Sequence, residues 1–275
     1  SGGSLRLKAA VEAKANIELL PDCPERTHKK ALELNDLVQQ GTQEIISCVF
    51  GAENGALITE LTASQTMFHM VELVMENIPG TNAVVSVLEH PSAFDAVEYF
   101  CKKTGKELRV IPADPDTGAI DPDTAASLVD ENTCLLSVMS ASNVTGAIMD
   151  IEAIVRKARA KKSDLYIISD AVQHAPHGVI DLEKVPVDGI NFAPYKFFGC
   201  RGSGIGYASD RVTQLPHPRL LGKAEETWSL GSPAPGHYAA ITEIVNYVCW
   251  LGSMDTDSAD RRELFVAGMN RIKLQ

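Results

Sequence analysis

The residues that could do chemistry lie just after short apolar runs. The four polar clusters are LTASQT after residues 55–61, LEHPS after 82–88, SASNVTG after 134–141 and SDAVQHAPH after 164–168. A fifth position is Lys196, whose neighbours Pro194, Tyr195, Phe197 and Phe198 are apolar or aromatic. An apolar setting favours the neutral, nucleophilic form of a lysine amine. The sequence therefore indicates a nucleophilic lysine accompanied by polar groups at strand ends.

Strands that alternate with helices must position these clusters. Helical periodicity is present at 5–20, 26–50, 64–78, 92–105, 150–163, 234–252 and in the last fifteen residues, with a turn and a short helix before residue 132. Further strands are expected at 107–113, 189–194 and 204–209. This alternation predicts an α/β fold, a mostly parallel sheet between two helix layers. Ligands of such sheets bind beyond the carboxyl ends of the strands, so the clusters should converge there.

Two local signals set expected helix ends. Thr27 precedes the periodic segment KKALELNDLVQQ and is the expected cap of the second helix, and Gly105 should end the helix over 92–105.

Composition restricts the class of protein. The 275 residues include 36 acidic and 25 basic side chains, a net charge of −11, which disfavours nucleic acid as the main partner. No apolar run approaches the ~18 residues that a membrane span needs, so we expect no membrane association. The six cysteines form no CxxC pair, which disfavours a structural zinc site and suits a reducing cytoplasm. We therefore expect a cytoplasmic globular protein.

The chain resembles the class V aminotransferase-fold enzymes, which depend on pyridoxal 5′-phosphate. The resemblance covers roughly residues 25–250 and rests on the order of the clusters and on Asp170, Gln173, Lys196, Gly199, Gly202, Gly204 and Gly206. The family includes cysteine desulfurases, selenocysteine lyases, kynureninases and aminotransferases. The resemblance implies the large domain of the aspartate aminotransferase-like, PLP-dependent transferase fold.

The resemblance also implies roles for the residues that face the cofactor ring. Lys196 matches the family's Schiff-base lysine, which also moves the substrate's Cα proton. Asp170 matches the carboxylate that pairs with the protonated pyridine nitrogen. His90 matches the histidine that stacks on the ring, and Asn143 and Gln173 match side chains near the ring's 3′-oxygen.

Four further positions match phosphate contacts of the family. Ala63 and Ser64 match the loop before a helix on which the phosphate rests, where free N–H groups favour an anion. Tyr195 could donate a hydrogen bond to the phosphate, as a tyrosine before the lysine does in kynureninase-like members. Ser232 matches a hydroxyl that reaches the phosphate of a neighbouring subunit, which implies a homodimer with a shared active site.

Within the family, the chain is expected to act on a small amino acid as a cysteine desulfurase or selenocysteine lyase-like enzyme. The alternatives are a class V aminotransferase and a kynureninase-like hydrolase. Typical desulfurases carry Ser-x-His-Lys, where this chain has Ala193, Pro194, Tyr195 and Lys196. Many members have Gly-Ala-Thr where this chain has a Thr-Ala-Ser sequence over 62–64.

Comparison with the family suggests how the chain divides. Residues 1–24 are expected to form an N-terminal helical segment, residues 25–252 the PLP-binding large domain, and residues 253–275 the start of a C-terminal segment. Family members usually continue into a small domain that carries the arginine for the substrate carboxylate and, in desulfurases, the catalytic cysteine. We expect that small domain to be missing from this chain.

Four other interpretations remain open at this stage. GCRGSGIG is glycine-rich like a dinucleotide loop, although its glycines precede a strand, and we expect them to let the backbone pass close to the lysine. Asp170, His174, His177 and Asp181 could form the metal site of a hydrolase by residue type, although our preferred interpretation contains no metal. Cys200 beside Arg201 could be a reactive thiol. The chain could also be a catalytically inactive family member.

Overall fold

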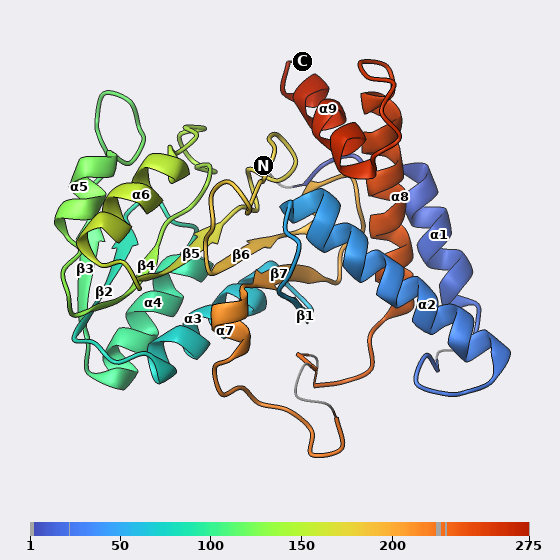
Figure 1. Cartoon of the computed structure of the whole chain (residues 1–275), viewed down its shortest axis with the longest axis horizontal. Coiled ribbons are helices and arrows are strands. Elements are labelled where there is room, and N and C mark those ends of the chain that lie inside the picture. Colours follow the sequence, from blue (N-terminus) through green and yellow to red (C-terminus); the bar gives the residue numbers. More distant parts are fainter. Residues whose placement is uncertain (1–2, 22, 224–226, 229, 275) are drawn as a thin grey trace.

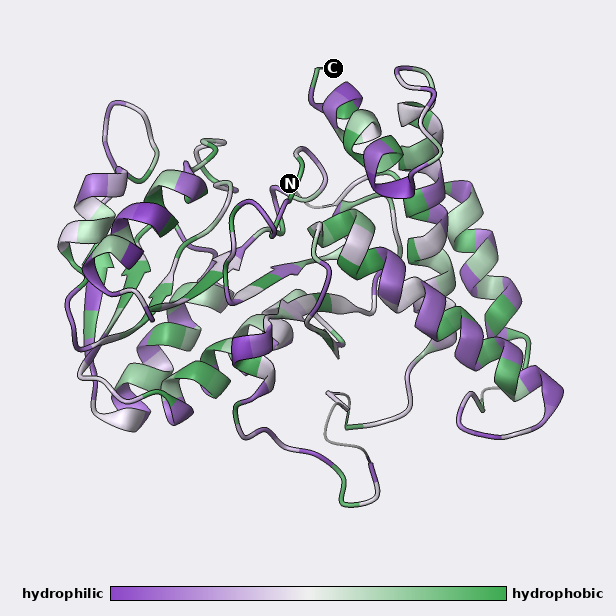
Figure 2. Cartoon of the chain, in the orientation of Figure 1, coloured by the Kyte–Doolittle hydropathy of each residue, from purple (hydrophilic) through white to green (hydrophobic). Residues whose placement is uncertain are grey.

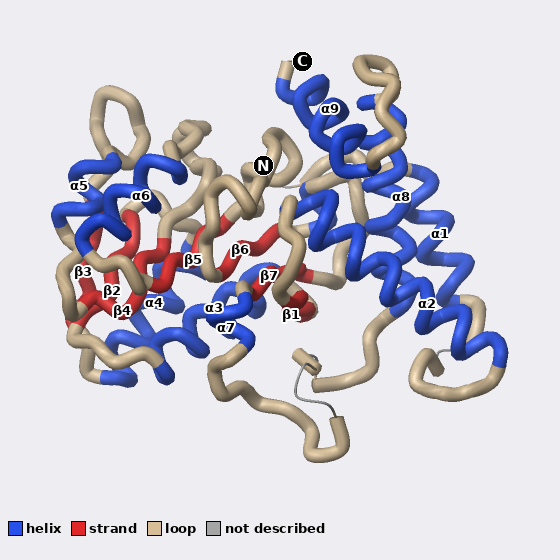
Figure 3. Tube along the Cα trace, viewed as in Figure 1, coloured by secondary structure: helices blue, strands red, loops and turns tan. Residues whose placement is uncertain are grey.

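A seven-stranded sheet forms the centre of the protein (Figures 1 and 3). The structure is a computed structural model that describes residues 3–21, 23–223, 227–228 and 230–274. The strands are β1 (Ala56–Glu60), β2 (Asn82–Ser86), β3 (Glu107–Ile111), β4 (Thr133–Ser137), β5 (Tyr166–Asp170), β6 (Gly189–Phe192) and β7 (Gly204–Ala208), in the order β1-β7-β6-β5-β4-β2-β3. β7 is antiparallel to β1 and β6, and the other pairs are parallel. The predicted mostly parallel sheet is confirmed.

Helices cover both faces of the sheet. α3 (Ala63–Asn77), α4 (Pro91–Thr104) and the short α7 (Asp210–Thr213) pack on one face. The other face carries α1 (Lys8–Glu18), α2 (Lys29–Glu44), η1 (Ile45–Phe50), α5 (Pro122–Ser127), α6 (Ile151–Lys161), α8 (Pro235–Gly252) and α9 (Arg261–Lys273). α8 packs against α1, α2 and α9. Among the described residues, no helix is both long and apolar enough to cross a membrane.

Strand residues alternate between the two layers, as the period of two in a strand requires. In β2, Ala83 and Val85 join the cluster beneath α3 and α4, whereas Val84 joins the cluster on the opposite face. In β4, Leu135 and Leu136 divide in the same way. Both faces are therefore buried, which explains why these strands are continuous apolar runs. The coloured ribbon in Figure 2 shows this apolar centre and the polar outer sides of the helices.

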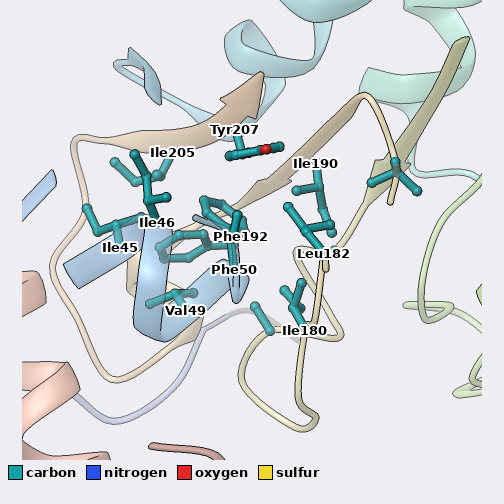
Figure 4. Close-up of a cluster of buried hydrophobic side chains, with 14 of the residues drawn as sticks. Ile45, Ile46, Val49, Phe50, Ile180, Leu182, Ile190, Phe192, Ile205 and Tyr207 are labelled. Atoms are coloured by element: carbon teal, nitrogen blue, oxygen red, sulfur yellow. The ribbon is translucent and has the colours of Figure 1, made fainter. Parts of the chain in front are cut away.

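An aromatic cluster anchors the strand that leads to Lys196. Phe50, the last residue of the π-helix η1, lies 5.6 Å from the ring of Phe192 in β6 and 5.7 Å from that of Tyr207 in β7 (Figure 4). Phe192 also meets Phe197, just beyond the lysine, at 6.3 Å. Aromatic pairs in such tilted or edge-on arrangements are worth about 0.5–1.5 kcal/mol beyond the area that they bury. The cluster therefore fixes the chain on both sides of Lys196.

The structure corrects several expected boundaries. The segment 26–50 is an α-helix that turns into a π-helix at Ile45. Its cap is His28 rather than Thr27, because His28 is extended and its Nδ1 accepts a hydrogen bond from Ala31 N. Gly105 does end α4, in the left-handed conformation with φ 70°. The strands, which were expected to end at residues 61, 88, 113, 141, 171, 194 and 209, stop one to four residues earlier. α7 is a helix that the sequence did not predict.

The predicted division at residues 24 and 252 stays a prediction. α1 packs on α8 and α9 packs on α8, so both end segments contact the same long helix. The last expected helical residue, Gln275, lies outside the described residues.

Candidate cofactor and active site

A cavity of about 210 Å³ lies at the carboxyl edge of the sheet. Eight of the nine predicted site residues line it, namely Ala63, Ser64, His90, Asn143, Asp170, Gln173, Tyr195 and Lys196. They come from the start of α3, the start of α4, the loop after β4, the end of β5 and the 3-10 turn η2 (Pro194–Lys196). The expected convergence of the polar clusters is therefore confirmed. Their roles toward a cofactor are not tested by this geometry and stay predictions.

Asp170 is the acidic group of the cavity and is only 4% exposed. Its Oδ1 accepts a hydrogen bond from Val172 N at 2.9 Å, and its own carbonyl accepts one from Ser140 N at 2.8 Å. Burial raises the pKa of Asp170, while that N–H and the nearby basic groups of His90 and Lys196 act to lower it. The carboxylate is thus held by backbone at the end of β5, facing the two basic side chains of the site.

His90 is held by the first turn of α4, which it caps. Its Nδ1 accepts from Ser92 N at 3.1 Å and lies 2.7 Å from Ser92 Oγ. A neutral imidazole that accepts at Nδ1 carries its proton on Nε2. This contact fixes the tautomer and the ring's orientation in the cavity wall.

Lys196 ends a short turn between buried aromatic residues. The turn closes through hydrogen bonds from Lys196 N to Ala193 O and from Phe197 N to Pro194 O. Lys196 Nζ lies 5.9 Å from the centre of the Tyr195 ring, and the guanidinium carbon of Arg201 lies 4.0 Å from that ring. Tyr195 is therefore flanked by two cations, and Arg201 is a cavity residue that the sequence interpretation did not assign to this site.

An N-terminal segment braces the lysine turn, which the sequence interpretation also missed. Ser4 N donates to Tyr195 O at 3.2 Å, and Ser4 Oγ accepts from Phe198 N at 2.8 Å. Leu7 N donates to Phe198 O at 2.7 Å. Phe198 has φ 58°, a left-handed conformation that is strained for a residue with a side chain. These contacts compensate that strain two residues after Lys196, and they involve residues too distant in sequence for a local motif to indicate.

The start of α3 forms the polar end of the cavity. Thr62 caps the helix by accepting from Gln65 N, and the first backbone bond of the helix runs from Thr66 N to Thr62 O. The N–H groups of Ala63 and Ser64 precede that bond, where the helix dipole favours an anion. Asn191 Nδ2 in β6 donates to Ala63 O at 3.0 Å and so fixes this end of the helix against the sheet.

Close contacts with backbone explain two glycines of the GCRGSGIG segment, Gly199 and Gly204. A Cβ on Gly204 would lie 2.2 Å from both Ala63 N and Thr62 C. Gly199 makes the expected close approach to the lysine turn, because its Cβ would lie 2.8 Å from Pro194 O, and Gly204 makes a second close approach at the start of α3.

Two buried polar atoms at the cavity have no hydrogen-bond partner among the described residues. They are Gln173 Nε2 and Ser203 Oγ, which both belong to cavity-lining residues. A buried polar group without a partner costs free energy unless a ligand or water satisfies it. Ser203, like Arg201, was part of the glycine-rich motif but was not expected to contribute a side chain.

Ser232 does not line this cavity. It lies in a neighbouring hollow of about 250 Å³ that shares Leu61, Gly202 and Ser203 with the first cavity. Ser232 is exposed, and its Oγ donates to Glu25 Oε1 at 2.5 Å. Its expected role toward a second subunit stays a prediction.

The competing interpretations fare differently. The residues that the structure describes include no group of three metal-ligating side chains, and His174 Nε2 instead contacts Val179 O at 3.2 Å. The glycine-rich segment leads into β7 rather than into a helix, unlike a dinucleotide loop. All six cysteines are free, and four of them are buried, namely Cys48, Cys101, Cys134 and Cys249.

Comparisons with known proteins agree with the fold. The family described as Aminotransferase class-V matches residues 24–246. A cysteine desulfurase of Cronobacter sakazakii is 31% identical over 189 residues, which are 63% of this chain and 46% of the relative. The chain therefore spans about half the length of the curated relatives that it matches.

Solved structures show the same fold at lower identity. The cysteine desulfurase CsdA of Escherichia coli matches with a TM-score of 0.78 at 18% identity, over 95% of this chain and 67% of that one. A cysteine desulfurase of Thermococcus onnurineus NA1 matches with a TM-score of 0.78 at 21% identity, over 92% and 70%. The sheet order, the cavity and the family match over 24–246 lead to one conclusion: the chain belongs to the class V aminotransferase family.

Proposed function

We propose that this chain binds pyridoxal 5′-phosphate in the cavity and forms the cofactor-binding part of a cysteine desulfurase-like enzyme. The observation that carries the proposal is that Asp170 and Lys196 line one cavity together with the start of α3. The identity to curated cysteine desulfurases supports the choice within the family.

The residues present fit the chemistry of this cofactor. The phosphate would accept from the N–H groups of Ala63 and Ser64, and the unpartnered Ser203 Oγ supplies a hydroxyl in the same cavity. Asp170 is a buried carboxylate suited to a protonated ring nitrogen, and Gln173 Nε2 is an unused donor for a ring oxygen. Lys196 supplies the amine that would hold the aldehyde carbon.

Pyridoxal phosphate, when bound, supplies an electron sink that stabilises negative charge on the substrate's Cα. This chain's own residues then have separate tasks. The Lys196 amine takes the proton from Cα and returns it as general acid. Asp170 keeps the ring nitrogen protonated. His90, fixed by Ser92, presents its ring as one wall of the site and limits how a flat ligand can lie.

Reduction with borohydride tests the lysine assignment directly. We expect the protein loaded with pyridoxal phosphate to carry the reduced adduct on Lys196, as identified by peptide mass spectrometry. The Lys196→Ala variant should carry none, whereas Lys184→Ala should match the unchanged protein, because Lys184 is exposed and paired with Glu152. An adduct in Lys196→Ala would refute the assignment.

Asp170→Asn tests the ring-nitrogen contact by affinity. A hydrogen bond to a charged group is worth about 1.5–3 kcal/mol, so we expect roughly 10- to 150-fold weaker binding of pyridoxal phosphate. Unchanged binding would contradict the contact.

Product analysis of the enzyme with a panel of amino acids tests the reaction. Release of alanine from cysteine, with sulfide formed when a thiol reductant is added, supports the desulfurase proposal, and formation of a keto acid would replace it with the aminotransferase alternative.

A further inference from the structure

Glu89 is a buried acidic residue that the functional assignment above does not use. It immediately precedes His90 and is 8% exposed. Its Oε1 accepts two short hydrogen bonds, from Ser86 Oγ and from Met139 N, each of 2.6 Å. Its Oε2 is buried and has no partner among the described residues. Glu89 thus joins the end of β2 to the chain just after β4, behind Met139, which lines the cavity.

The charged group nearest in effect to Glu89 is Asp170, which lines the cavity. The titratable group that faces it is Asp170 at the end of β5, and its other two partners, Ser86 and the Met139 N–H, are neutral. Asp170 in turn faces His90 at the start of α4 and Lys196 in η2. Two buried carboxyl groups that repel each other do not both ionise readily, and the one with cationic neighbours keeps the charge.

The two hydrogen bonds to Oε1 favour the ionised form of Glu89, but the unpartnered Oε2 favours the neutral form. A buried ionised oxygen without a donor is far more costly than a neutral one, and Glu89 Oε2 has no donor. Burial, with the charge of Asp170 in addition, raises the pKa of Glu89 to about 8.

We propose that Glu89 is a positioning residue whose carboxyl stays protonated at neutral pH, so that it links β2 to β4 without competing with Asp170 for negative charge. The proposal rests on the proposed function only in that the charge left on Asp170 is the one that would hold the cofactor. Its structural part concerns the protein without any ligand.

The pH dependence of unfolding measures this proton in the absence of cofactor. Glutamate in the unfolded chain has a pKa near 4.5, so between that value and about 8 the folded protein holds one proton more than the unfolded chain. Stability relative to a variant that cannot ionise must then fall as the pH rises through this range. Glu89→Gln is that variant, because it keeps an acceptor oxygen and has nearly the same shape.

We expect the ratio of the unfolding constant of the unchanged protein to that of Glu89→Gln to increase about tenfold per pH unit between about pH 5 and pH 8, and to level off above. In an Asp170→Asn background the levelling-off should move to lower pH, because the charge that raises the Glu89 pKa is gone. The exposed Glu131→Gln is the matched control and should show a ratio independent of pH over this range. A flat ratio for Glu89→Gln would overturn the proposal.

A second measurement needs no Glu89 variant, should Glu89→Gln fail to fold. The infrared difference spectrum of the unchanged protein between neutral and alkaline pH should lose the carbonyl band of a protonated carboxylic acid. Absence of that band at neutral pH would overturn the proposal. Neither measurement uses pyridoxal phosphate, so failure of cofactor binding and failure of this proposal are separate results.

Discussion

Gly204 is the point at which β7 passes closest to the start of α3, and Gly204→Ala tests whether that approach builds the site. The added Cβ would lie 2.2 Å from Ala63 N and Thr62 C and 2.4 Å from Thr62 O. Favourable carbon contacts lie near 3.5–4.0 Å, so the two segments must separate by about 1.3 Å or more. All three atoms are backbone, and no side-chain rotation can relieve the overlap. Gly204 also lacks a left-handed φ, so the variant adds bulk without backbone strain.

The expected cost follows from that overlap. Overpacking a close-packed interior typically costs about 1–3 kcal/mol, and we expect Gly204→Ala at the upper end because only backbone can move. The same movement displaces the N–H groups of Ala63 and Ser64, so affinity for pyridoxal phosphate should fall about tenfold or more, equivalent to about 1.4 kcal/mol.

Urea unfolding and a cofactor titration of the same purified variants measure both effects. Gly222→Ala is the matched control, because its Cβ would meet nothing within 4 Å and its φ is not left-handed. Equal urea midpoints for the two variants would refute the steric reasoning. Lower stability of Gly204→Ala with undiminished cofactor affinity would show that the phosphate does not rest on the start of α3.

Two further substitutions test contacts that support the sheet edge. Asp188 is 2% exposed and accepts from Ile167 N at 2.8 Å and from Arg159 at 2.9 Å. Asp188→Ala should leave the buried Ile167 N–H unpaired and lower the free energy of unfolding by about 1–3 kcal/mol in urea, whereas the exposed Asp123→Ala should have no measurable effect. Ser4→Ala removes the hydroxyl that accepts from Phe198 N. We expect the free energy of unfolding to fall by about 1 kcal/mol and hydrogen exchange of the Phe198 amide to become faster. An unchanged exchange rate would contradict the brace that we describe.

Much of the fold could be predicted from the sequence because its signals are local. The buried strands are short apolar runs, and polar residues lie at or soon after their ends, as Asp170 does at the end of β5 and His90 does at the cap of α4. In a parallel sheet the carboxyl ends of strands share an edge, so strand order was not needed to expect that Asp170 and Lys196 meet. The same logic explains why Ser232, which follows no strand end, falls in a different hollow.

What the sequence could not predict depends on contacts between distant segments. Nothing local in Ser4 indicates that it braces Phe198, 194 residues away. From the sequence, Glu89 would be an exposed acidic residue just before a helix. In the structure its carboxyl accepts a hydrogen bond from Met139 N, 50 residues away. His28 caps α2 although hydroxyl and carboxylate side chains are preferred at that position, so propensity favoured Thr27 instead.

The net charge of −11 and an anion-binding cavity are compatible because the site controls charge locally. At the start of α3 the attraction for a phosphate comes from backbone N–H groups and the helix dipole, which add no net charge to the chain. Asp170 lines the cavity and Glu89 lies behind it, so full ionisation of both buried carboxyl groups would place two negative charges near a ligand that is itself anionic. A proton on Glu89 leaves one negative charge, on Asp170, where backbone and two basic side chains stabilise it. The acidic side chains therefore lie mostly on the surface, while the cavity presents one acidic group, three basic side chains (His90, Lys196 and Arg201) and the unused donors of Gln173 and Ser203.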